Sequence, residues 1–584
     1  MTKTKRLTHL SGRNDGRMLL RQPFLLLTIL MVAAALSIFV LLPMFNVIRF
    51  AVTTREGYFT LAPMFNLMTT PRIQRAFQNS MQLGAIVAVT ATFVGYLFAF
   101  AVARTEIPCK KFFQVIATFP IVSPPFVLAL AVIFLFGRQG LITRGVFGIR
   151  DFEVLGLHSL ILVQTVTFFP IAFLTLRGIL ESIDDSVEDA AFSIGASRGR
   201  VFRTITLPLS LPGIISSMLL VLILSIEDFA NPAVLGGSYH TLVVEVYRII
   251  TGMYDLHSGA AVSLFLLVPA VAAYLIQKHW LRKKSFVTVS GKPTQKRRKI
   301  HEKHIVYPLF GVCLLISLFI ILLYGTVLAG AFFQVWGVNY TFTLVHFNRV
   351  FMMGESAITN SIVLAAWATP IGGLLGIAIA YLTVRKRFFG RRAIELTSML
   401  IFAIPGTVLG IGYIASFNTP PLLLTGTGLI LVAAFVFRNL PVAVESGTAT
   451  LLQIDKSIDE ASTIAGAGSG YTFMRITLPL LKTAFFSGLV FAFVRAVTAV
   501  STIIFLVSPR WPLATAQVFS IFEGNLFSLA AAYVVVLVVI ILTAIAVISI
   551  VVQFILKPRA KAPKQELVDR AIANYELSAR KELG

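Results

Sequence analysis

The sequence from Glu188 to Leu209 reads EDAAFSIGASRGRVFRTITLPL, and the sequence from Asp459 to Leu480 reads DEASTIAGAGSGYTFMRITLPL. About half of the aligned positions are identical, so the chain contains an internal duplication. Both copies are polar and contain glycines, whereas long apolar runs precede and follow them. We therefore expect each copy to form a structured loop at a membrane surface, outside the membrane-spanning segments.

The composition is that of an integral membrane protein. Hydrophobic residues make up 57% of the 584 residues and charged residues only 13%, which lies outside the range of soluble proteins. A helix needs about 20 apolar residues to cross the hydrocarbon core, where its backbone groups must be paired within the helix. We predict an all-α fold with about twelve transmembrane helices, expected at 24–42, 83–102, 113–136, 157–176, 211–226, 260–276, 305–329, 362–384, 394–415, 422–444, 485–506 and 527–556.

The positive charge of the chain agrees with this assignment. The chain carries 50 Lys and Arg against 26 Asp and Glu, a formal net charge of +24. Because Lys and Arg are retained on the cytoplasmic side of membranes, the basic segments place both termini and both polar loops in the cytoplasm. The charge is spread over several cytoplasmic segments, so it predicts contact with membrane lipids and no nucleic-acid partner.

The duplication divides the chain into two halves of similar organisation. Residues 1–280 form the first repeat with its polar loop at 181–209, here named the first loop, and residues 305–556 form the second repeat with its polar loop at 452–480, the second loop. A basic cytoplasmic linker at 281–304 joins the repeats, and residues 557–584 form a cytoplasmic tail. Because each half has six predicted spans, an even number, the repeats are expected to share one orientation in the membrane.

Each loop reads as a short helix, a turn and a second short helix. Acidic residues cluster where the first turn of a helix favours negative charge, and a glycine in each loop lets the chain turn. Small residues leave a low face that a partner protein can approach closely, although a plain structural loop is the alternative. The residues predicted to dock a partner are Glu188, Asp189, Ala190, Ala191 and Gly195 in the first loop and Asp459, Glu460, Ala461, Ser462 and Gly466 in the second.

The pattern resembles the cytoplasmic E-A-A loop of the permease subunits of binding-protein-dependent ABC importers. The chain carries it as Asp189-Ala190-Ala191 with Ile205-Thr206-Leu207-Pro208, and as Glu460-Ala461-Ser462 with Ile476-Thr477-Leu478-Pro479. The resemblance implies the type I importer permease fold in a bacterial inner membrane. It also implies that two copies of a cytoplasmic ATPase receive the loops as coupling helices, and that an external or periplasmic binding protein delivers the solute.

No enzymatic chemistry is expected of this chain. It contains no G-x-x-x-x-G-K-[ST] phosphate-binding signature, so the resemblance implies that ATP and Mg are bound by the partner ATPase, with no cofactor and no catalytic residue here. His301 and His304 lie in the basic linker without further ligands, and two cysteines give no disulfide framework. A metal site is left unassigned.

Polar residues within the predicted spans mark a candidate transport pathway. Ionisable groups are costly in the membrane and usually face the interior of the bundle or water. For each of them, an ion pair that only holds the bundle together is an equally good interpretation. The candidates are Glu227, Asp228, Asn231, Arg438, Arg495 and Ser501. In addition, Pro124-Pro125 and Pro405-Gly406 are expected to break helices at matching positions of the two halves.

The transported solute is not decided by these residues. The fused arrangement resembles the ferric-iron uptake permeases, so ferric iron is favoured on resemblance and not on ligand chemistry. Similar permeases carry phosphonates, sugar phosphates, thiamine or polyamines. A secondary transporter driven by an ion gradient would match the span count, but it gives no reason to repeat a glycine-hinged cytoplasmic loop.

Overall fold

The computed structural model describes residues 23–54, 56–149, 151–283, 299–455 and 457–556. Long helices dominate these residues, and most of them are apolar along their whole length. Their backbone groups are therefore paired within each helix, as a membrane interior requires. The predicted tail and most of the predicted linker lie outside the described residues.

The order of elements repeats between the two halves. In the first half the elements are α2 (Pro23–Leu36), η1 (Ser37–Leu41), α3 (Leu42–Ala51), α4 (Ala62–Thr69), α5 (Pro71–Arg104), α6 (Lys110–Val122), α7 (Val127–Phe136), η2 (Leu141–Val146), α8 (Leu157–Ser182), α9 (Asp185–Ser193), α10 (Arg198–Val201), η3 (Phe202–Thr206), α11 (Leu207–Glu227), α12 (Ala230–Leu235), α13 (Leu242–Tyr247), η4 (Arg248–Gly252) and α14 (Leu256–Lys283). In the second half they are α15 (Lys303–Gly330), β1 (Phe333–Val335), β2 (Asn339–Phe342), α16 (Val345–Arg385), α17 (Arg391–Leu400), η5 (Ile401–Ala403), α18 (Gly406–Phe417), α19 (Gly428–Gln453), α20 (Ser457–Ile464), α21 (Ser469–Thr472), η6 (Phe473–Thr477), α22 (Leu478–Val497), η7 (Ile503–Phe505), α23 (Ala514–Glu523) and α24 (Phe527–Leu556).

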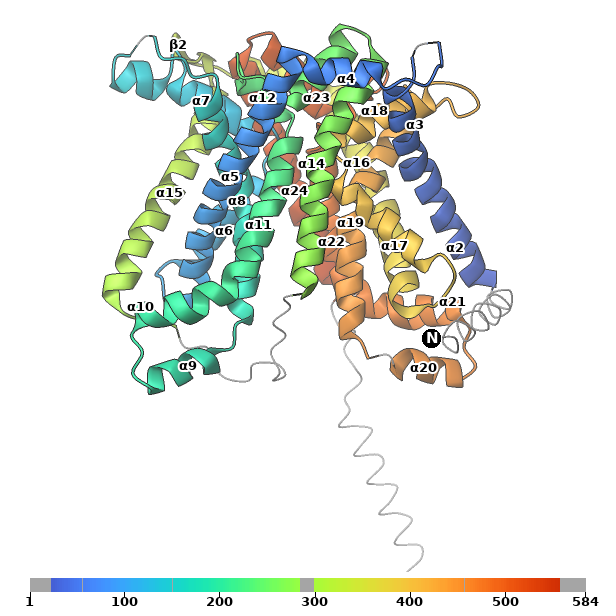
Figure 1. Cartoon of the computed structure of the whole chain (residues 1–584). Coiled ribbons are helices and arrows are strands. Elements are labelled where there is room, and N and C mark those ends of the chain that lie inside the picture. Colours follow the sequence, from blue (N-terminus) through green and yellow to red (C-terminus); the bar gives the residue numbers. More distant parts are fainter. Residues whose placement is uncertain (1–22, 55, 150, 284–298, 456, 557–584) are drawn as a thin grey trace, which may run out of the picture.

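The long helices run between two ends of the molecule (Figure 1). One end carries α9 and α20, the first helices of the two loops, and the other end carries α4, α12 and α23. The strands β1 and β2 pair antiparallel into a small hairpin, which is the one departure from an all-α fold among the described residues. Both loops therefore lie at the same end, as a parallel duplication predicts.

Most of the predicted spans correspond to long apolar helices. Ten described helices are long and apolar enough to cross a membrane, or eleven if α17–η5 and α18, which meet at 114°, form one span. Six of these helices belong to the first half, and four, together with the bent pair, belong to the second. Within α22, the described stretch Gly488–Val497 is a shorter apolar helix.

The boundaries of two predicted spans are also corrected. The span predicted at 113–136 is broken, because α6 ends at Val122 and α7 begins at Val127, on either side of Pro124-Pro125. Proline lacks the N–H that a helix interior needs and restricts the residue before it. The matching Pro405 starts α18 after the bend in the second half, so both predicted breaks are present. The span predicted from 422 begins only at Gly428.

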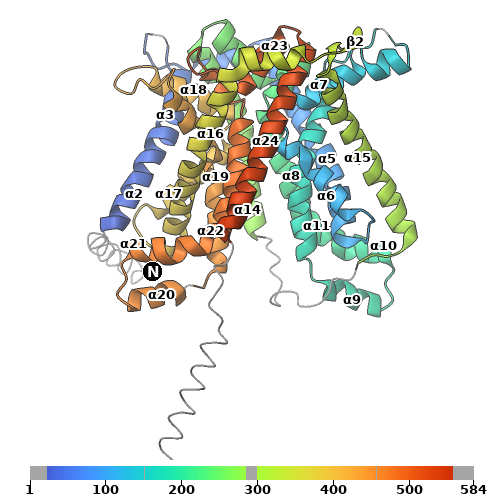
Figure 2. The same ribbon diagram turned by 180° about the vertical axis from the view of Figure 1, so that it is seen from behind.

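The first helix of each half packs against the other half. Helix α15 contacts α5, α6 and α7 of the first half, while α3 contacts α18 of the second. Ring contacts between the halves accompany this packing. Phe39 of η1 stacks on Phe437 of α19 with centroids 5.0 Å apart, and Phe113 of α6 meets Phe310 of α15 edge to face at 5.6 Å. Figure 2 shows the exchange from behind, with α15 beside α5 and α6, and α2 and α3 beside α17 and α18. The two repeats are therefore interlocked by their first helices.

Matching residues hold the second and fourth long helices of each half together. A methyl group on Gly95 of α5 would lie 2.8 Å from the Ala172 side chain of α8, and Gly376 of α16 approaches Ala443 of α19 in the same way. Only glycine permits so close an approach at these crossings. The starts of α13 and α23 are held in the same way in the two halves. The Leu242 N–H donates to Ser80 Oγ, and the Ala514 N–H donates to Ser361 Oγ.

Candidate coupling loops and transport pathway

The first loop is a capped helix followed by a sharp turn. Asp184 accepts a hydrogen bond from the Ser186 N–H at 3.0 Å and caps α9, which satisfies one of the unpaired donors of the first turn. Gly195 then adopts φ +84°, a left-handed conformation that disfavours other residues. The chain continues through α10 and η3 into α11, so the loop ends inside a long membrane helix.

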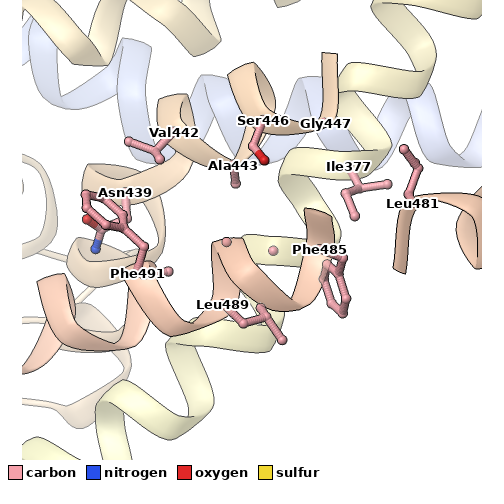
Figure 3. Close-up of a pocket in the computed structure, with 13 residues that line it drawn as sticks. Ile377, Asn439, Val442, Ala443, Ser446, Gly447, Leu481, Phe485, Leu489 and Phe491 are labelled. Carbon is pink, nitrogen blue, oxygen red and sulfur yellow. The ribbon is translucent and has the colours of Figure 1, made fainter. Parts of the chain in front are cut away.

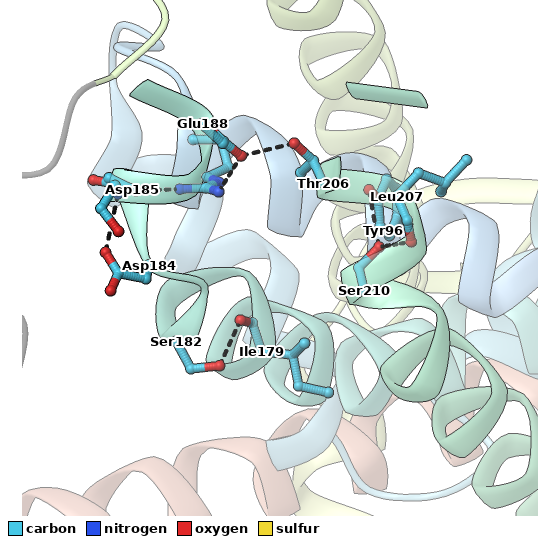
Figure 4. Close-up of polar contacts among 11 residues, drawn as sticks. Tyr96, Ile179, Ser182, Asp184, Asp185, Glu188, Thr206, Leu207 and Ser210 are labelled. Atoms are coloured by element: carbon cyan, nitrogen blue, oxygen red, sulfur yellow. Dashed lines mark hydrogen bonds and ion pairs between the residues drawn. The ribbon is translucent and has the colours of Figure 1, made fainter. Parts of the chain in front are cut away.

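An arginine at the end of a membrane helix holds the first loop in place. Arg104, the last residue of α5, donates to Asp185 Oδ1 at 2.7 Å and to Glu188 Oε1 at 2.5 Å. Thr206 Oγ1, just before α11, donates to the same Glu188 oxygen at 2.7 Å. Figure 4 shows this cluster, in which Glu188 lies between the end of α5 and the start of α11. Only 5% of Arg104 is exposed, so the loop and the two membrane helices are joined by a largely buried ionic contact.

The second loop repeats this arrangement with weaker contacts. Arg385, the last residue of α16, lies 3.2 Å from Asp459 Oδ2, and its guanidinium also donates to the carbonyl oxygens of Leu451 and Ile454. Thr477 Oγ1 lies 3.4 Å from Asp459 Oδ1. The shorter Asp side chain reaches less far than the Glu in the first loop. We name the two contacts the first clasp (Arg104, Asp185, Glu188, Thr206) and the second clasp (Arg385, Asp459, Thr477).

The helix start and the glycine turn of the second loop also match the first. The Ser457 N–H donates to Asp455 Oδ1 at 2.9 Å, and this backbone hydrogen bond lowers the pKa of Asp455 from its ordinary value. Gly466 adopts φ +80°. A short helix, a left-handed glycine and a second short helix therefore occur in both loops, as the sequence predicts.

The remaining predicted docking residues divide between the surface and the interior of the loops. Ala190, Gly195, Glu460, Ala461 and Gly466 are exposed, whereas Asp189 and Ala191 are half-buried. Ser462 is buried and lies 2.9 Å from Thr472 Oγ1, with which it shares a hydrogen bond. Glu188 and Asp459 point toward the clasps. The predicted set thus contains an outward group that a partner can touch and an inward group that fixes the loop.

Two exposed isoleucines were not predicted from the sequence. Ile194 is 86% exposed and Ile464 is 88% exposed, each next to the glycine turn of its loop. Val187 and Ile458, at matching positions of the two first helices, are also exposed. Exposed apolar side chains on a polar loop are typical of a surface that a partner covers. The available signal was an isoleucine within two residues before the turn glycine in both copies.

A cavity of about 310 Å³ lies beneath the first loop, and its walls include Tyr96, Phe100, Phe202 and Ile305. In the second half, Phe24 of α2 occupies the place that Ile305 of α15 has in the first. The Phe24 ring lies 6.5 Å from the Phe473 ring, and Phe24 also packs against Gly470. The smaller Ile305 side chain leaves the corresponding space open.

The predicted pathway residues form two separate groups. Arg438 on α19 donates to Glu227 Oε2 on α11 at 2.7 Å and to the Ile404 carbonyl oxygen at 2.7 Å, so this ion pair connects the two halves. Asp228 instead accepts from Gln164 at 2.9 Å and from Asn231 at 2.7 Å, both in the first half. Sequence analysis missed Gln164, which is fully buried on α8.

The other two candidates belong to the second half. Arg495 on α22 is exposed yet interacts electrostatically with Glu227 and Arg438, so it lies beside the ion pair. Ser501 is half-buried and is close to Gly406 at the proline break. The structure therefore brings Glu227, Arg438 and Arg495 together and leaves Asp228 and Asn231 in a neighbouring network.

A second cavity lies between α16, α19 and α22 and is too small for a solute (Figure 3). Its volume is about 20 Å³, and Ile377, Ala443, Gly447 and Phe485 are among the residues around it. Such a space holds about one water molecule. Within the described ranges there is also no group of three or more His, Cys, Asp or Glu that could hold a metal ion.

A duplicated helical bundle with an ionic contact between its halves and two matching loops at one end defines a membrane transport subunit. Residues 92–285 and 372–562 both match the family of binding-protein-dependent transport system inner membrane components. The chain belongs to this family and is a permease of the ABC importer class, with one copy of the family domain in each half.

Several curated proteins are similar to this chain. A protein of Haemophilus influenzae that carries the name of a ferric transport system permease, FbpB 1, is 38% identical over 77% of this chain and 73% of its own length. The ferric transport system permease FbpB of Actinobacillus pleuropneumoniae is 36% identical over 85% of this chain and 73% of its own length. The molybdenum transport system permease ModB of Escherichia coli is 29% identical over 37% of this chain and 95% of its own length. One repeat therefore corresponds in length to a whole single-copy permease.

Proposed function

We propose that this chain moves ferric iron into the cytoplasm as the membrane subunit of an ATP-driven importer. The observation that carries the choice of solute is the similarity to two ferric transport permeases over most of the chain. The chain supplies the pathway, and ATP with its Mg is bound by a separate ATPase. A binding protein on the outer side delivers the iron.

The two loops are the proposed contact with the ATPase. Each presents an exposed isoleucine beside its turn glycine, and each is tied by a clasp to helices that cross the membrane. One copy of the ATPase would bind each loop, because the loops lie at the same end of the molecule (Figure 1). A movement of an ATPase subunit would then be passed through Arg104 to α5 and through Arg385 to α16.

The orientation follows from the same loops. If the loops meet a cytoplasmic ATPase, the start of α2 and the end of α24, which lie at that end of the bundle, face the cytoplasm as well. The excess of Lys and Arg in the segments assigned to this side supports the orientation. We place the chain in a bacterial inner membrane on this basis.

The proposed function is tested by uptake into right-side-out proteoliposomes. They contain this chain with its ATPase on the inner face, and the binding protein is added outside. We expect uptake of radioactive ferric iron that requires enclosed ATP and both partners. A control without the ATPase, with an imposed proton or sodium gradient, should show no uptake. Uptake that is driven by the gradient alone would identify a secondary transporter instead.

A further inference from the structure

The two halves meet inside the membrane through a buried ion pair. Glu227 is 5% exposed, and the Arg438 side chain is 18% exposed. Oε2 of Glu227 accepts the hydrogen bond from Arg438, whereas Oε1 is buried without a hydrogen-bond partner among the described residues. Arg438 also binds the carbonyl oxygen of Ile404, next to the broken helix α17–α18. This contact therefore links α11 of one half to α19 and the proline break of the other.

A second arginine beside the pair has no partner of its own. Among the described residues, Arg495 forms no hydrogen bond and no ion pair, although it interacts electrostatically with Arg438 and Glu227. Its side chain is not covered by other described residues. An unpaired charge in a membrane protein is costly, and such residues usually face a ligand or a water-filled path.

The charges at this place favour an anion. Two guanidinium groups face one carboxylate, and the nearby Asp228 is already held by the amides of Gln164 and Asn231. A bare ferric ion prefers several oxygen ligands, and the described residues contain no cluster of three or more His, Cys, Asp or Glu that could hold a metal ion. Guanidinium groups, in contrast, bind carboxylate and phosphate oxygens through paired N–H donors.

Aromatic side chains of both halves lie next to this cluster. Phe229, two residues after Glu227, packs against Tyr247 at 4.9 Å and against Phe519 of the second half at 5.5 Å between ring centroids. Tyr247 also contacts Phe505 at 5.9 Å. The ion pair and the aromatic contact therefore join the same two halves at neighbouring positions of the chain.

We propose that Arg438 and Arg495 bind an oxyanion of the transported complex, so that ferric iron crosses the membrane together with a carboxylate or phosphate ligand. The incoming oxyanion replaces the Glu227 carboxylate on Arg438, which releases the contact between α11 and α19, while Arg495 provides the second guanidinium. This inference rests on the proposed transport of ferric iron and adds the chemical form in which the iron passes.

The experiment uses proteoliposomes with the complete transporter and two doubly labelled probes. In one arm, radioactive iron is supplied with ³²P-phosphate, and in the other with ¹⁴C-citrate. We expect one of the two labelled anions to accumulate with the iron in a fixed ratio. Iron uptake without either anion would overturn the proposal, although the proposed ferric function would stand. Uptake of an anion without iron would overturn the ferric function but keep the oxyanion site.

Substitution of the unpaired arginine provides the second readout. Arg495→Gln removes no ion-pair partner from another described residue, so we expect the variant to fold. We expect its uptake rate to fall more than tenfold. Arg495→Lys should retain part of the uptake with a raised KM for the complex. Arg177→Gln is the matched control, because the ion pair that the structure describes for Arg177 is with Glu181 on the same helix. Equal uptake in Arg495→Gln and the control would contradict the proposal.

Discussion

The two loops have the same backbone design but are fastened to the membrane helices with different strength. In the first clasp, Arg104 binds two carboxylates at 2.7 and 2.5 Å. In the second, Arg385 binds one carboxylate at 3.2 Å and completes its contacts with carbonyl oxygens at the end of α19. The two halves therefore differ in how firmly each loop is attached to its membrane helices.

The neighbourhood of each loop adds to this difference. The first loop is also tied to the start of α15, where the Arg198 Nε donates to Glu302 Oε1 at 2.9 Å. The second loop instead rests on the aromatic side chain of Phe24. The first loop is thus held by ion pairs on two sides, whereas the second, in the part that the structure describes, combines the Arg385–Asp459 ion pair with apolar contact to Phe24.

The largest effect is expected from removing the arginine of the first clasp. Arg104→Ala leaves Asp185 and Glu188 without their shared cation, and breaking a buried ion pair from one side costs about 3–5 kcal/mol. Iron uptake should fall at least tenfold, while the ATPase activity of the complex is no longer raised by the loaded binding protein. Arg385→Ala should lower uptake less. Equal losses in the two variants would remove the proposed asymmetry, and Arg177→Ala serves as the control for expression.

The next effect concerns the glycine turns, which are alike in both loops. Gly195→Val and Gly466→Val place a branched residue at positive φ, which costs about 1–2 kcal/mol. No atom lies within 4 Å of the added Cβ in either case, so the cost comes from the backbone alone. We expect both variants to insert in the membrane, hydrolyse ATP and import less iron.

The matched control for the turns is asparagine, which tolerates the left-handed conformation better than valine does. Gly195→Asn and Gly466→Asn should keep most of the uptake measured in proteoliposomes. If asparagine and valine reduce uptake equally at either position, the conformation of the turn is not what coupling requires.

A smaller effect is expected from exchanging the acidic residues of the clasps. Asp459→Glu adds the methylene group that the second clasp lacks, and Glu188→Asp removes it from the first. The ion pair gains or loses roughly 1 kcal/mol for such partly exposed contacts. The first change should raise the thermal midpoint of the chain in detergent, and the second should lower it. No shift in either direction would show that distance within the clasps is unimportant.

The smallest effect is the response of the first loop to acid. The backbone hydrogen bond at the start of α15, together with Arg198, lowers the pKa of Glu302 from its ordinary value. A lowered pKa in the folded state means that the pair is fully formed above the unfolded pKa and is lost as the pH falls through the folded value. A spin label at Ala196 should therefore become more mobile as the pH falls below the ordinary pKa range of a glutamate.

Glu302→Gln separates this pair from other acidic groups in the loop. In the variant, the label at Ala196 should already be more mobile at pH 7, with a smaller further change on acidification. A label at the matching Ala467 of the second loop should not respond to the Glu302 substitution. If mobility at Ala196 is the same in wild type and variant at pH 7, the Glu302 contact does not hold the loop.

The sequence predicted the repeated design of the loops but not how they are attached. The acidic helix starts, Gly195 and Gly466 are local features, so spacing and residue type were enough to find them. The clasps join residues 84 positions apart in the first half, and nothing in the local sequence says which arginine meets Glu188. The exchange of α2 and α15 between halves was hidden for the same reason.

The span count shows a different limit of sequence reasoning. An apolar average does not reveal that α17–η5 and α18 meet at 114° beside Pro405. Likewise, Glu227, Arg438 and Arg495 were recognised as costly polar residues, but their meeting across two halves required the fold. Gln164 was missed because a single amide within an apolar run carries little signal.

Crosslinking of the two loop tips tests the central claim most directly. The native Cys109 and Cys313 are first changed to serine and alanine, and a single cysteine then replaces Ile194 or Ile464. The complex with the ATPase is treated with a short bifunctional crosslinker in inverted membrane vesicles. We predict that both positions crosslink to the ATPase, and that a cysteine at Phe65 on α4, at the opposite end of the molecule, does not. Labelling of either loop tip only from the outer face of the membrane, or no crosslink to the ATPase from either, would contradict the account.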